Sequence, residues 1–267
     1  DKFIVTESTY SHSGKKKKLN FDISNYPKFK DKIKYIVIDK EPEGIVEENN
    51  NPTLQRANSL KRVELSYNEH FNAIKDADDN DFVMLSDNDE IPNLDSEDFK
   101  KNKNDIVIFN QLFFYFKFNL LYNKMLWPGT KGCRKKKLIS FSWLRNIKFK
   151  KYPIWRIDTY FSKTKYSNLN IIKNGGWHFT NLKSPEDMFE KFMNFGHHDE
   201  FRLSGITIDK IKDKISKREM FYDHFADKSS TNKWESDYKL QNIDLSLLPK
   251  YLIDNKNKYK DWFDLKE

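Results

Sequence analysis

A short apolar run, Phe82–Leu85, leads directly into the acidic segment Ser86-Asp-Asn-Asp-Glu-Ile-Pro92. The run predicts a buried strand, and Pro92 is expected to end it. Asp87 and Asp89 then lie at its carboxyl end, the edge at which open α/β sheets place their ligands. Carboxylates at this spacing suit Mg²⁺ or Mn²⁺, which usually bind through one or two carboxylates and the phosphates of a substrate. The segment therefore predicts an α/β fold with a metal site for a nucleotide diphosphate, and a solvated acidic turn is the alternative.

Length and composition fit one large globular domain. The chain has 267 residues, of which 15% are aromatic, and it has no long polar or repetitive tract, so a sizeable core can be buried. The single cysteine, Cys133, excludes an internal disulfide and a cluster of thiolates for zinc. The apolar runs fall well short of the roughly 18 residues that span a bilayer. We therefore expect no transmembrane segment in this sequence.

Charge is segregated along the chain, although the net charge is only +8. Residues 76–105 carry eleven acids against three lysines, whereas residues 117–156 carry twelve Lys or Arg and no acid. If the basic segment folds beside the acidic one, it forms an electropositive wall for phosphates. A nucleic acid would be attracted by the same wall. For Arg134–Lys137, lysines that merely solvate an aromatic surface are the alternative.

Alternating strands and helices are predicted along the rest of the chain. Apolar runs predict strands over Lys2–Glu7, Ile33–Asp39 and Asp105–Asn110. The aromatic run Gln111–Phe118 follows without a turn signal, and most of its rings are expected in the core. Trp127–Gly132 is rich in turn residues and predicts a loop.

Helix signals occur at three places. Asn51-Pro52 predicts the start of a helix that runs to about Ala77, with one apolar face formed by Leu54, Ala57, Leu60 and Val63. Ser184-Pro185 predicts a second helix start, followed by Met188, Phe192 and Phe195 at helical spacing. Ile208, Ile211 and Ile215 predict an amphipathic helix near the C-terminus.

The paired glycines of Gly175-Gly-Trp-His-Phe179 are expected to let the backbone approach a ligand closely. They follow the short apolar stretch Leu169–Ile172 and present Trp177 and His178. His178 is a candidate metal ligand, and a structural or surface histidine is the alternative.

Eight segments share their order and motifs with a known family: Phe3–Ser8, Ser13–Leu19, Gln55-Arg56, Ser86–Pro92, Trp127–Thr130, Gly175–Phe179, His198–Phe201 and Leu248–Asn255. Together they resemble glycosyltransferase family 17, the family of the β-1,4-mannosyl-glycoprotein 4-β-N-acetylglucosaminyltransferase. The resemblance covers nearly the whole chain, and Asp-x-Asp-Glu-Ile-Pro together with Gly-Trp-His is specific. The sequence departs from relatives at Lys15–Lys18, where lysine and proline often alternate, and at Asn88 within the Asp-x-Asp motif.

The resemblance implies an α/β, GT-A-like nucleotide-diphospho-sugar transferase fold with a mixed central sheet flanked by helices. It implies one domain over 1–267, in which 1–110 is mainly the nucleotide-binding half and 111–267 mainly the acceptor half with C-terminal helices. The expected activity is that of an inverting, metal-dependent glycosyltransferase with Mn²⁺ or Mg²⁺ as cofactor. It would move a sugar, by default N-acetylglucosamine, from a UDP-sugar donor to a hydroxyl of a glycan acceptor. We expect no nucleic-acid partner.

Residue roles follow from this resemblance. The expected metal ligands are Asp87, Asp89 and His178. The expected donor-binding residues are Thr6, Glu7, Lys17, Arg56, Ser86, Asp87, Arg145 and Trp177, with the basic members for the diphosphate. The candidates for the general base are Glu200 first, then Asp199 and Glu186. Tyr115 and Trp127 are acceptor-binding candidates that could stack on sugar faces, and Glu90 is expected to brace the metal loop.

Two other classes stay open on sequence grounds. A metal-dependent nuclease or other phosphoryl-transfer enzyme also combines acidic metal clusters with basic walls. A non-catalytic basic module for nucleic acid or a membrane surface would use Asp87 and Asp89 only as capping or solvated acids. The bias toward Lys, Asn, Ile and Phe indicates an AT-rich microbial or viral genome. We expect a cytoplasmic location. Because the chain opens on Asp1 rather than Met, a Golgi-type anchor can have been removed.

Overall fold

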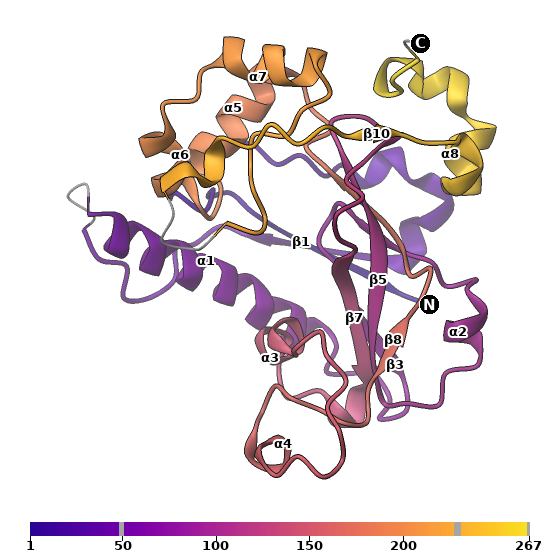
Figure 1. The fold of residues 1–267 in the computed structure, drawn as a ribbon. Helices are drawn as coiled ribbons and strands as arrows, with labels where there is room; N and C mark the ends of the chain where they lie inside the picture. The colour runs from indigo at the N-terminus through magenta and orange to yellow at the C-terminus, as the bar shows by residue number, and fades with distance from the viewer. Residues whose placement is uncertain (48–50, 227–230, 266–267) are drawn as a thin grey trace. The chain divides into compact units, whose positions relative to one another are not determined.

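A computed structural model describes residues 1–47, 51–226 and 231–265 (Figure 1). The contacts within the chain define two compact units that are interleaved in sequence. Unit 1 consists of residues 1–77, 140–142 and 187–206, and unit 2 of residues 78–139, 143–186 and 207–267. The single domain over 1–267 stays a prediction.

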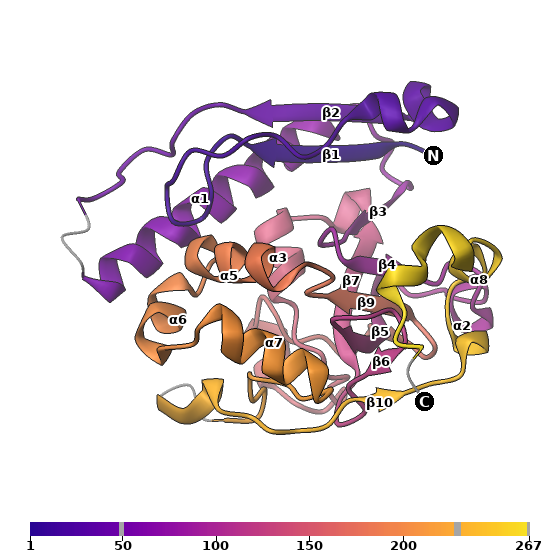
Figure 2. The same cartoon turned by 90° about the horizontal axis from the view of Figure 1, so that it is seen from above.

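Unit 1 is built on two parallel strands and a long helix (Figure 2). The strands are β1 (Phe3–Ser8) and β2 (Ile33–Ile38), both as predicted. Helix α1 (Pro52–Ala73) starts as predicted after Asn51, whose Oδ1 accepts the Thr53 N–H at 2.9 Å. This contact satisfies one of the donors that every helix start leaves unpaired.

The buried face of α1 is polar, so the predicted apolar face is wrong. Leu60 is half exposed, whereas Asn58 and Ser59 are buried. Asn58 donates to the Val46 carbonyl at 2.7 Å and accepts the Val46 N–H at 3.1 Å, and Ser59 donates to the His12 carbonyl at 2.9 Å. The loops of unit 1 therefore satisfy this face by hydrogen bonding, as buried polar groups require.

Further elements with residues in unit 1 are the 3₁₀ helices η1 (Ile23–Asn25) and η2 (Pro27–Lys32) and the helices α5 (Pro185–Asn194) and α6 (His198–Ser204). The start of α5 at Pro185 confirms the prediction, and Met188 and Phe192 are buried on its predicted apolar face.

Unit 2 contains a large mixed sheet with the order β10-β6-β5-β7-β3, to which β8, β9 and β4 are added. Strands β8 and β9 run parallel to β5, whereas the other pairs are antiparallel. The strands are β3 (Phe82–Leu85), β4 (Glu90–Pro92), β5 (Ile106–Tyr115), β6 (Leu120–Leu121), β7 (Trp127–Arg134), β8 (Asn170–Ile172), β9 (Gly176–Thr180) and β10 (Gln241–Asn242).

Strand β5 carries the core of unit 2. The predicted strand at 105–110 and the aromatic run as far as Tyr115 form one continuous strand, which crosses the border placed at residue 110 from the sequence. Val107, Phe109, Phe113 and Phe114 are almost completely buried, and burying each large side chain contributes about 1.5–3 kcal/mol. The predicted core position of these rings is confirmed.

Helices flank this sheet. The ring of Phe99 in α2 (Glu97–Lys100) packs on that of Phe109 with centroids 5.1 Å apart, and Leu252 of α8 (Lys250–Asp254) joins a buried cluster with Phe114. Ile211 of α7 (Ile208–Ser216) is buried on the predicted apolar face. The helices with residues in unit 2 include α2 (Glu97–Lys100), α3 (Phe141–Asn146), α4 (Asp158–Phe161), α7 (Ile208–Ser216), α8 (Lys250–Asp254), η3 (Lys135–Lys137), η4 (Thr231–Trp234), η5 (Leu245–Leu247) and η6 (Lys256–Trp262). An α/β fold with a large mixed sheet is thus present.

The predicted loop at 127–132 is wrong, because these residues form most of β7. Its glycines allow close packing within the sheet. A Cβ atom at Gly129 would collide with Gln111 Oε1 and lie 2.6 Å from Gln111 Cδ, and one at Gly132 would lie 2.5 Å from the Phe82 ring. The predicted strand before the acidic segment ends at Leu85, so Pro92 does not end it and is instead the last residue of β4.

Within the described ranges, no helix combines the length and the apolar character that crossing a bilayer requires.

Candidate active site at the acidic turn

The acidic turn, residues 86–89 of unit 2, connects β3 to β4. The Glu90 N–H donates to the Asp87 carbonyl at 3.0 Å, and the Glu90 carboxylate accepts the Asp87 N–H at 3.1 Å. The Ser86 hydroxyl lies 2.7 Å from that of Thr130 in β7. Strand β4 then pairs with β9, where Glu90 lies opposite His178. The turn is therefore closed locally and placed by the sheet.

Glu90 supports the acidic turn through hydrogen bonds of its buried carboxylate. Its side chain is fully buried, and it accepts hydrogen bonds from Trp127 Nε1 at 2.8 Å and from Arg145 Nη1 at 3.3 Å. Burial raises the pKa of Glu90 and the charge of Asp87 adds to this effect, while Arg145 and Trp127 oppose it. A carboxylate held by three donors fits the bracing role expected for Glu90.

Arg145 joins both carboxylates of the turn. Its Nη2 lies 2.7 Å from Asp87 Oδ2, in addition to the contact with Glu90. Lys131 of β7 fixes the chain around Arg145, because its Nζ donates to the carbonyls of Arg145 and Ile147 at 2.5 and 2.7 Å. Burial lowers the pKa of Lys131 to about 8, and the charge of Arg145 adds to this shift. The guanidinium thus stands beside the acidic turn on a fixed segment.

His178 meets the acidic turn through Asp89. The Nε2 of His178 lies 3.3 Å from Asp89 Oδ2, and the Phe179 N–H donates to the Asp89 carbonyl at 2.8 Å. The imidazole is buried and packs against the rings of Phe113 and Trp127, with centroids 4.8 and 4.5 Å away. Its Nδ1 is buried and has no hydrogen-bond partner in the part of the chain that the structure describes. The ring is therefore held by packing, with Nε2 directed at Asp89.

The glycines before His178 make close contacts with neighbouring strands, in place of the predicted approach to a ligand. Gly176 has a φ of +117°, and a Cβ atom at Gly175 would lie 2.5 Å from the backbone N of Asn110. Trp177 points away from His178, as alternate residues of a strand do. Its Nε1 donates to the Leu247 carbonyl at 2.7 Å. The structure therefore does not bring Trp177 to the acidic turn.

The predicted ligands Asp87, Asp89 and His178 do not form a group of three. Over the described ranges, no three His, Cys, Asp or Glu side chains are placed to hold a metal ion. The donor atoms of Asp89 and His178 are nevertheless close enough to share one small octahedral cation such as Mn²⁺. Two ligands at right angles on an octahedral ion with bonds of about 2.1 Å are about 3.0 Å apart, close to the observed 3.3 Å. Such ions keep several waters and need only one or two protein ligands besides phosphates.

Glu7 of unit 1, a predicted donor contact, organises the loop that follows β1. Its carboxylate accepts hydrogen bonds from Lys17 Nζ at 2.6 Å, from the Tyr35 hydroxyl at 3.0 Å and from the N–H groups of Asn20 and Phe21. Burial raises the pKa of Glu7, but these hydrogen bonds outweigh it and leave the pKa below its usual value. Glu7 and Lys17 thus neutralise each other in this structure.

Thr6 and Arg56, the other donor-binding candidates in unit 1, also have partners. The Thr6 hydroxyl lies 2.9 Å from His70 Nε2, and the Arg56 guanidinium donates to the Gly196 carbonyl. Their predicted contacts with a nucleotide stay predictions.

The three candidates for the general base lie in different surroundings. Glu200 and Asp199 lie in the first turn of α6, where Glu200 Oε1 is 3.4 Å from His197 Nδ1. Asp199 has a buried Oδ1 without a hydrogen-bond partner among the described residues. Glu186 forms an exposed ion pair with Lys212 at 2.8 Å, and this hydrogen bond lowers its pKa. Their catalytic roles stay predictions.

The two acceptor-binding candidates lie in an aromatic cluster around Phe113. Tyr115 is only 5% exposed, and its hydroxyl lies 2.5 Å from His224 Nε2. Trp127 contacts both His178 and Phe113. Burial lowers the pKa of His224 to about 4, and the charge of His178 contributes. His224 was not identifiable from the sequence, because it stands alone in a loop without a motif.

Comparison with known proteins shows which class of enzyme this is. The family model described as Glycosyltransferase family 17 matches residues 1–263, so the protein is a glycosyltransferase. More specifically, the chain belongs to glycosyltransferase family 17, as the ordered motifs predicted. No curated protein and no solved structure matched the chain.

Proposed function

We propose that this glycosyltransferase is inverting and metal-dependent, has a GT-A-like fold, and moves a sugar, by default N-acetylglucosamine, from a UDP-sugar to a hydroxyl of a glycan acceptor. The pair of Asp89 and His178, with its donor atoms 3.3 Å apart, carries the metal-dependent part of this proposal. Membership of the family supports glycosyl transfer itself.

Asp89 and His178 would hold Mn²⁺ or Mg²⁺. When bound, such an ion would stabilise the negative charge on a leaving diphosphate by roughly several kcal/mol. His178 is buried and packed by two rings, so it presents Nε2 without losing further side-chain freedom. Asp87 is proposed as a contact of the donor, with its carboxylate paired to Arg145 before the donor binds.

Arg145 is the proposed diphosphate ligand of unit 2. Its guanidinium is partly exposed, and it offers the planar fork that matches phosphate oxygens. Lys17 and Arg56 of unit 1 stay proposals from the family resemblance, as do Thr6 and Glu7 for the uridine.

An inverting transfer needs a carboxylate that accepts the proton of the acceptor hydroxyl while the oxygen attacks C1 of the donor sugar. Glu200 is the first proposal for this base, and Asp199 and Glu186 are the next. Replacing each by its amide separates them, because only the true base should lower kcat strongly while leaving the donor affinity intact. The cytoplasmic location and the microbial or viral origin stay predictions from sequence.

The decisive experiment measures the melting temperature with and without Mn²⁺ and UDP. A ligand that binds the folded protein raises its stability, so wild type should melt higher with both present. Asp89→Ala should abolish this shift, and without ligands this variant should still show the melting transition of a folded protein. Asp95→Ala removes a fully exposed carboxylate from the same acidic stretch, and it should keep the shift.

No shift for wild type with any nucleoside diphosphate would overturn the proposal. A screen of nucleotide sugars for Mn²⁺-dependent hydrolysis then identifies the donor, because slow attack by water requires no acceptor. Mn²⁺-dependent cleavage of a nucleic acid in place of a nucleotide sugar would favour the phosphoryl-transfer alternative.

A further inference from the structure

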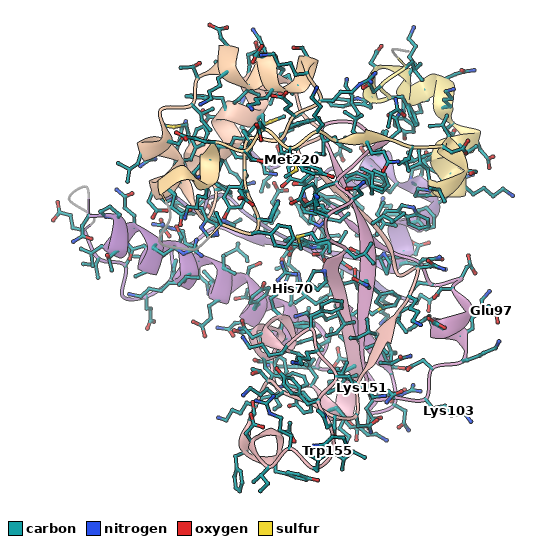
Figure 3. The ribbon with its side chains drawn as sticks, in the orientation of Figure 1. His70, Glu97, Lys103, Lys151, Trp155 and Met220 are labelled. Atoms are coloured by element: carbon teal, nitrogen blue, oxygen red, sulfur yellow. The ribbon has the colours of Figure 1, made fainter. Side chains whose placement is uncertain are left out.

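We call residues 148–165, an exposed segment of unit 2, the aromatic loop. Among the described residues, it holds five of the six most exposed large hydrophobic side chains, with 70–85% of each exposed: Ile154, Trp155, Ile157, Tyr160 and Phe161. The loop contains α4 (Figure 1), and Trp155 and Lys151 mark it in Figure 3. A soluble surface rarely groups so much apolar area without a partner.

The exposure belongs to a defined conformation. The Lys148 N–H donates to the Thr164 carbonyl at 2.8 Å, and the Tyr152 N–H donates to the Tyr166 carbonyl at 3.2 Å, so the two ends of the loop are tied together. Nearer the tip, the Tyr160 hydroxyl donates to a backbone carbonyl of the loop at 3.1 Å. The apolar side chains are therefore presented on a fixed scaffold.

The same loop is strongly basic. It carries six Lys or Arg and a single acid, Asp158, which gives a net charge of +5. Asp158 is neutralised by Arg156 at 2.6 Å and by Lys165 at 2.7 Å. Lys150 and Arg156 also lie over the Tyr152 ring, 5.7 and 5.2 Å from its centroid. The loop thus combines a high positive charge with its exposed apolar side chains.

We propose that the aromatic loop inserts into the interface of a lipid bilayer that contains anionic lipids. Trp and Tyr side chains prefer the headgroup level of a membrane, and aliphatic and Phe side chains enter the adjoining acyl region. Lysines and arginines near the surface are attracted by anionic headgroups. Trp155 and Tyr160 match the first requirement, and Ile154, Ile157 and Phe161 match the second.

The aliphatic side chains distinguish a membrane from a nucleic acid as the occupant. A single-stranded nucleic acid binds by stacking bases on aromatic rings beside a cationic track. Ile154 and Ile157 have no flat ring to offer a base, yet both are more than 70% exposed. The proposal goes beyond sugar transfer and does not depend on it, because vesicle binding needs neither donor nor acceptor.

The test is flotation of the full chain with vesicles of phosphatidylcholine and phosphatidylglycerol, against vesicles of phosphatidylcholine alone. We expect binding to the anionic vesicles that weakens as salt rises. The double variant Trp155→Ser/Phe161→Ser should lower the partition coefficient about tenfold or more. The triple variant Lys148→Gln/Lys150→Gln/Lys151→Gln should lower it about tenfold or more and flatten the salt dependence.

Matched controls separate the loop from general surface effects. Leu203→Ser removes another highly exposed apolar side chain, 80% exposed in α6, and should leave vesicle binding unchanged. Lys100→Gln/Lys101→Gln/Lys103→Gln removes the same charge from exposed lysines elsewhere, so it should weaken binding much less. Because all substituted side chains in the loop are exposed, unchanged thermal melting verifies that the variants fold.

Two results would overturn the proposal. One is that wild type does not bind vesicles, or that the loop variants bind them as well as wild type does. The other is salt-sensitive binding to single-stranded polyuridylate, lost in the same variants, without any binding to vesicles. That outcome would assign the loop to a nucleic acid.

Discussion

The imidazole Nε2 of His178 lies 3.3 Å from the carboxylate Oδ2 of Asp89, although β9 and the acidic turn come from distant parts of the chain. The backbone sets this relationship, because β4 pairs with β9 so that Glu90 faces His178. A slip of this pairing by one residue would turn the imidazole to the other face of the strand. The proposed metal pair thus depends on strand register as much as on the two side chains.

The first prediction concerns Arg145→Gln. Because Arg145 neutralises Asp87 at 2.7 Å, its loss should leave more negative charge at the turn and strengthen the binding of Mn²⁺ without nucleotide. The same change removes a charged hydrogen-bond partner of the diphosphate, so the KM for the donor should rise about tenfold to a hundredfold. Calorimetric titration with Mn²⁺ and steady-state kinetics measure the two effects.

Arg134→Gln is the matched control, because this arginine of β7 bonds to the Asn80 carbonyl at 2.8 Å and not to the acidic turn. It should change neither quantity strongly. A parallel loss of Mn²⁺ and donor affinity in Arg145→Gln would show that Arg145 only holds the turn in shape.

The second prediction concerns Trp127→Phe. Trp127 Nε1 donates to the buried Glu90 carboxylate at 2.8 Å, and an unmade hydrogen bond to a buried charge costs about 1–3 kcal/mol. The variant should lose that much unfolding free energy, as measured by urea titration. In the double variant with Glu90→Gln, the losses should be non-additive by about 1 kcal/mol, since the two side chains contact each other. Additive losses would contradict the bracing role of this pair.

Local signals in the sequence predicted much of the framework. Asn51 and Pro52 specify the start of α1 by a cap and a fixed φ, and the apolar runs of β1 and β2 have strand composition. The start of α5 at Pro185 has the same kind of local cause. These elements need no knowledge of neighbouring segments.

Other features depend on neighbours that a pattern does not show. Gly129 and Gly132 look like turn residues, but they are small because Gln111 and Phe82 pack against them in the sheet. The polar face of α1 is buried because loops of unit 1 pair with it. In the candidate site, the acidic turn and His178 were identifiable from motifs, whereas the contact of Asp87 with Arg145 was not. His224 had no signal at all, because its surroundings come from distant parts of the chain, including β5 and β7.

The third prediction concerns pH. The pKa of His224 is about 4 in the folded chain, below the unfolded value of about 6.5. Between these values the unfolded chain binds a proton that the folded chain does not, so stability is full above about pH 6.5 and falls as the pH drops toward 4. The loss can reach about 3 kcal/mol at 1.36 kcal/mol per pKa unit. Urea unfolding at about pH 7 and about pH 4.5 measures it.

His224→Gln should flatten this slope without removing it, because burial also lowers the pKa of His70 in unit 1. Tyr115→Phe removes the hydroxyl that contacts His224 and leaves the imidazole in place. It should therefore keep most of the pH dependence. An equal slope in wild type and His224→Gln would refute the assignment.

The fourth prediction compares two glycines. Gly176 has a φ of +117°, and a Cβ atom there would lie 2.7 Å from the backbone N of Asn93 and against the Ile91 carbonyl. Gly205 also has a positive φ, +66°, but a Cβ atom would meet no atom within 4 Å. Gly205→Ala should therefore cost about 1–2 kcal/mol of unfolding free energy from backbone strain alone, whereas Gly176→Ala should cost clearly more, about 3 kcal/mol or above.

The excess cost of Gly176→Ala has a functional consequence that separates it from simple strain. The added methyl group pushes β9 away from β4, and this pairing holds His178 opposite Glu90 and beside Asp89. The variant should therefore also lose the rise in melting temperature with Mn²⁺ and UDP, measured at a temperature where it is still folded, while Gly205→Ala keeps it. Equal costs for the two alanines, or a full shift in Gly176→Ala, would mean that the proposed metal pair does not depend on the close approach of β4 and β9.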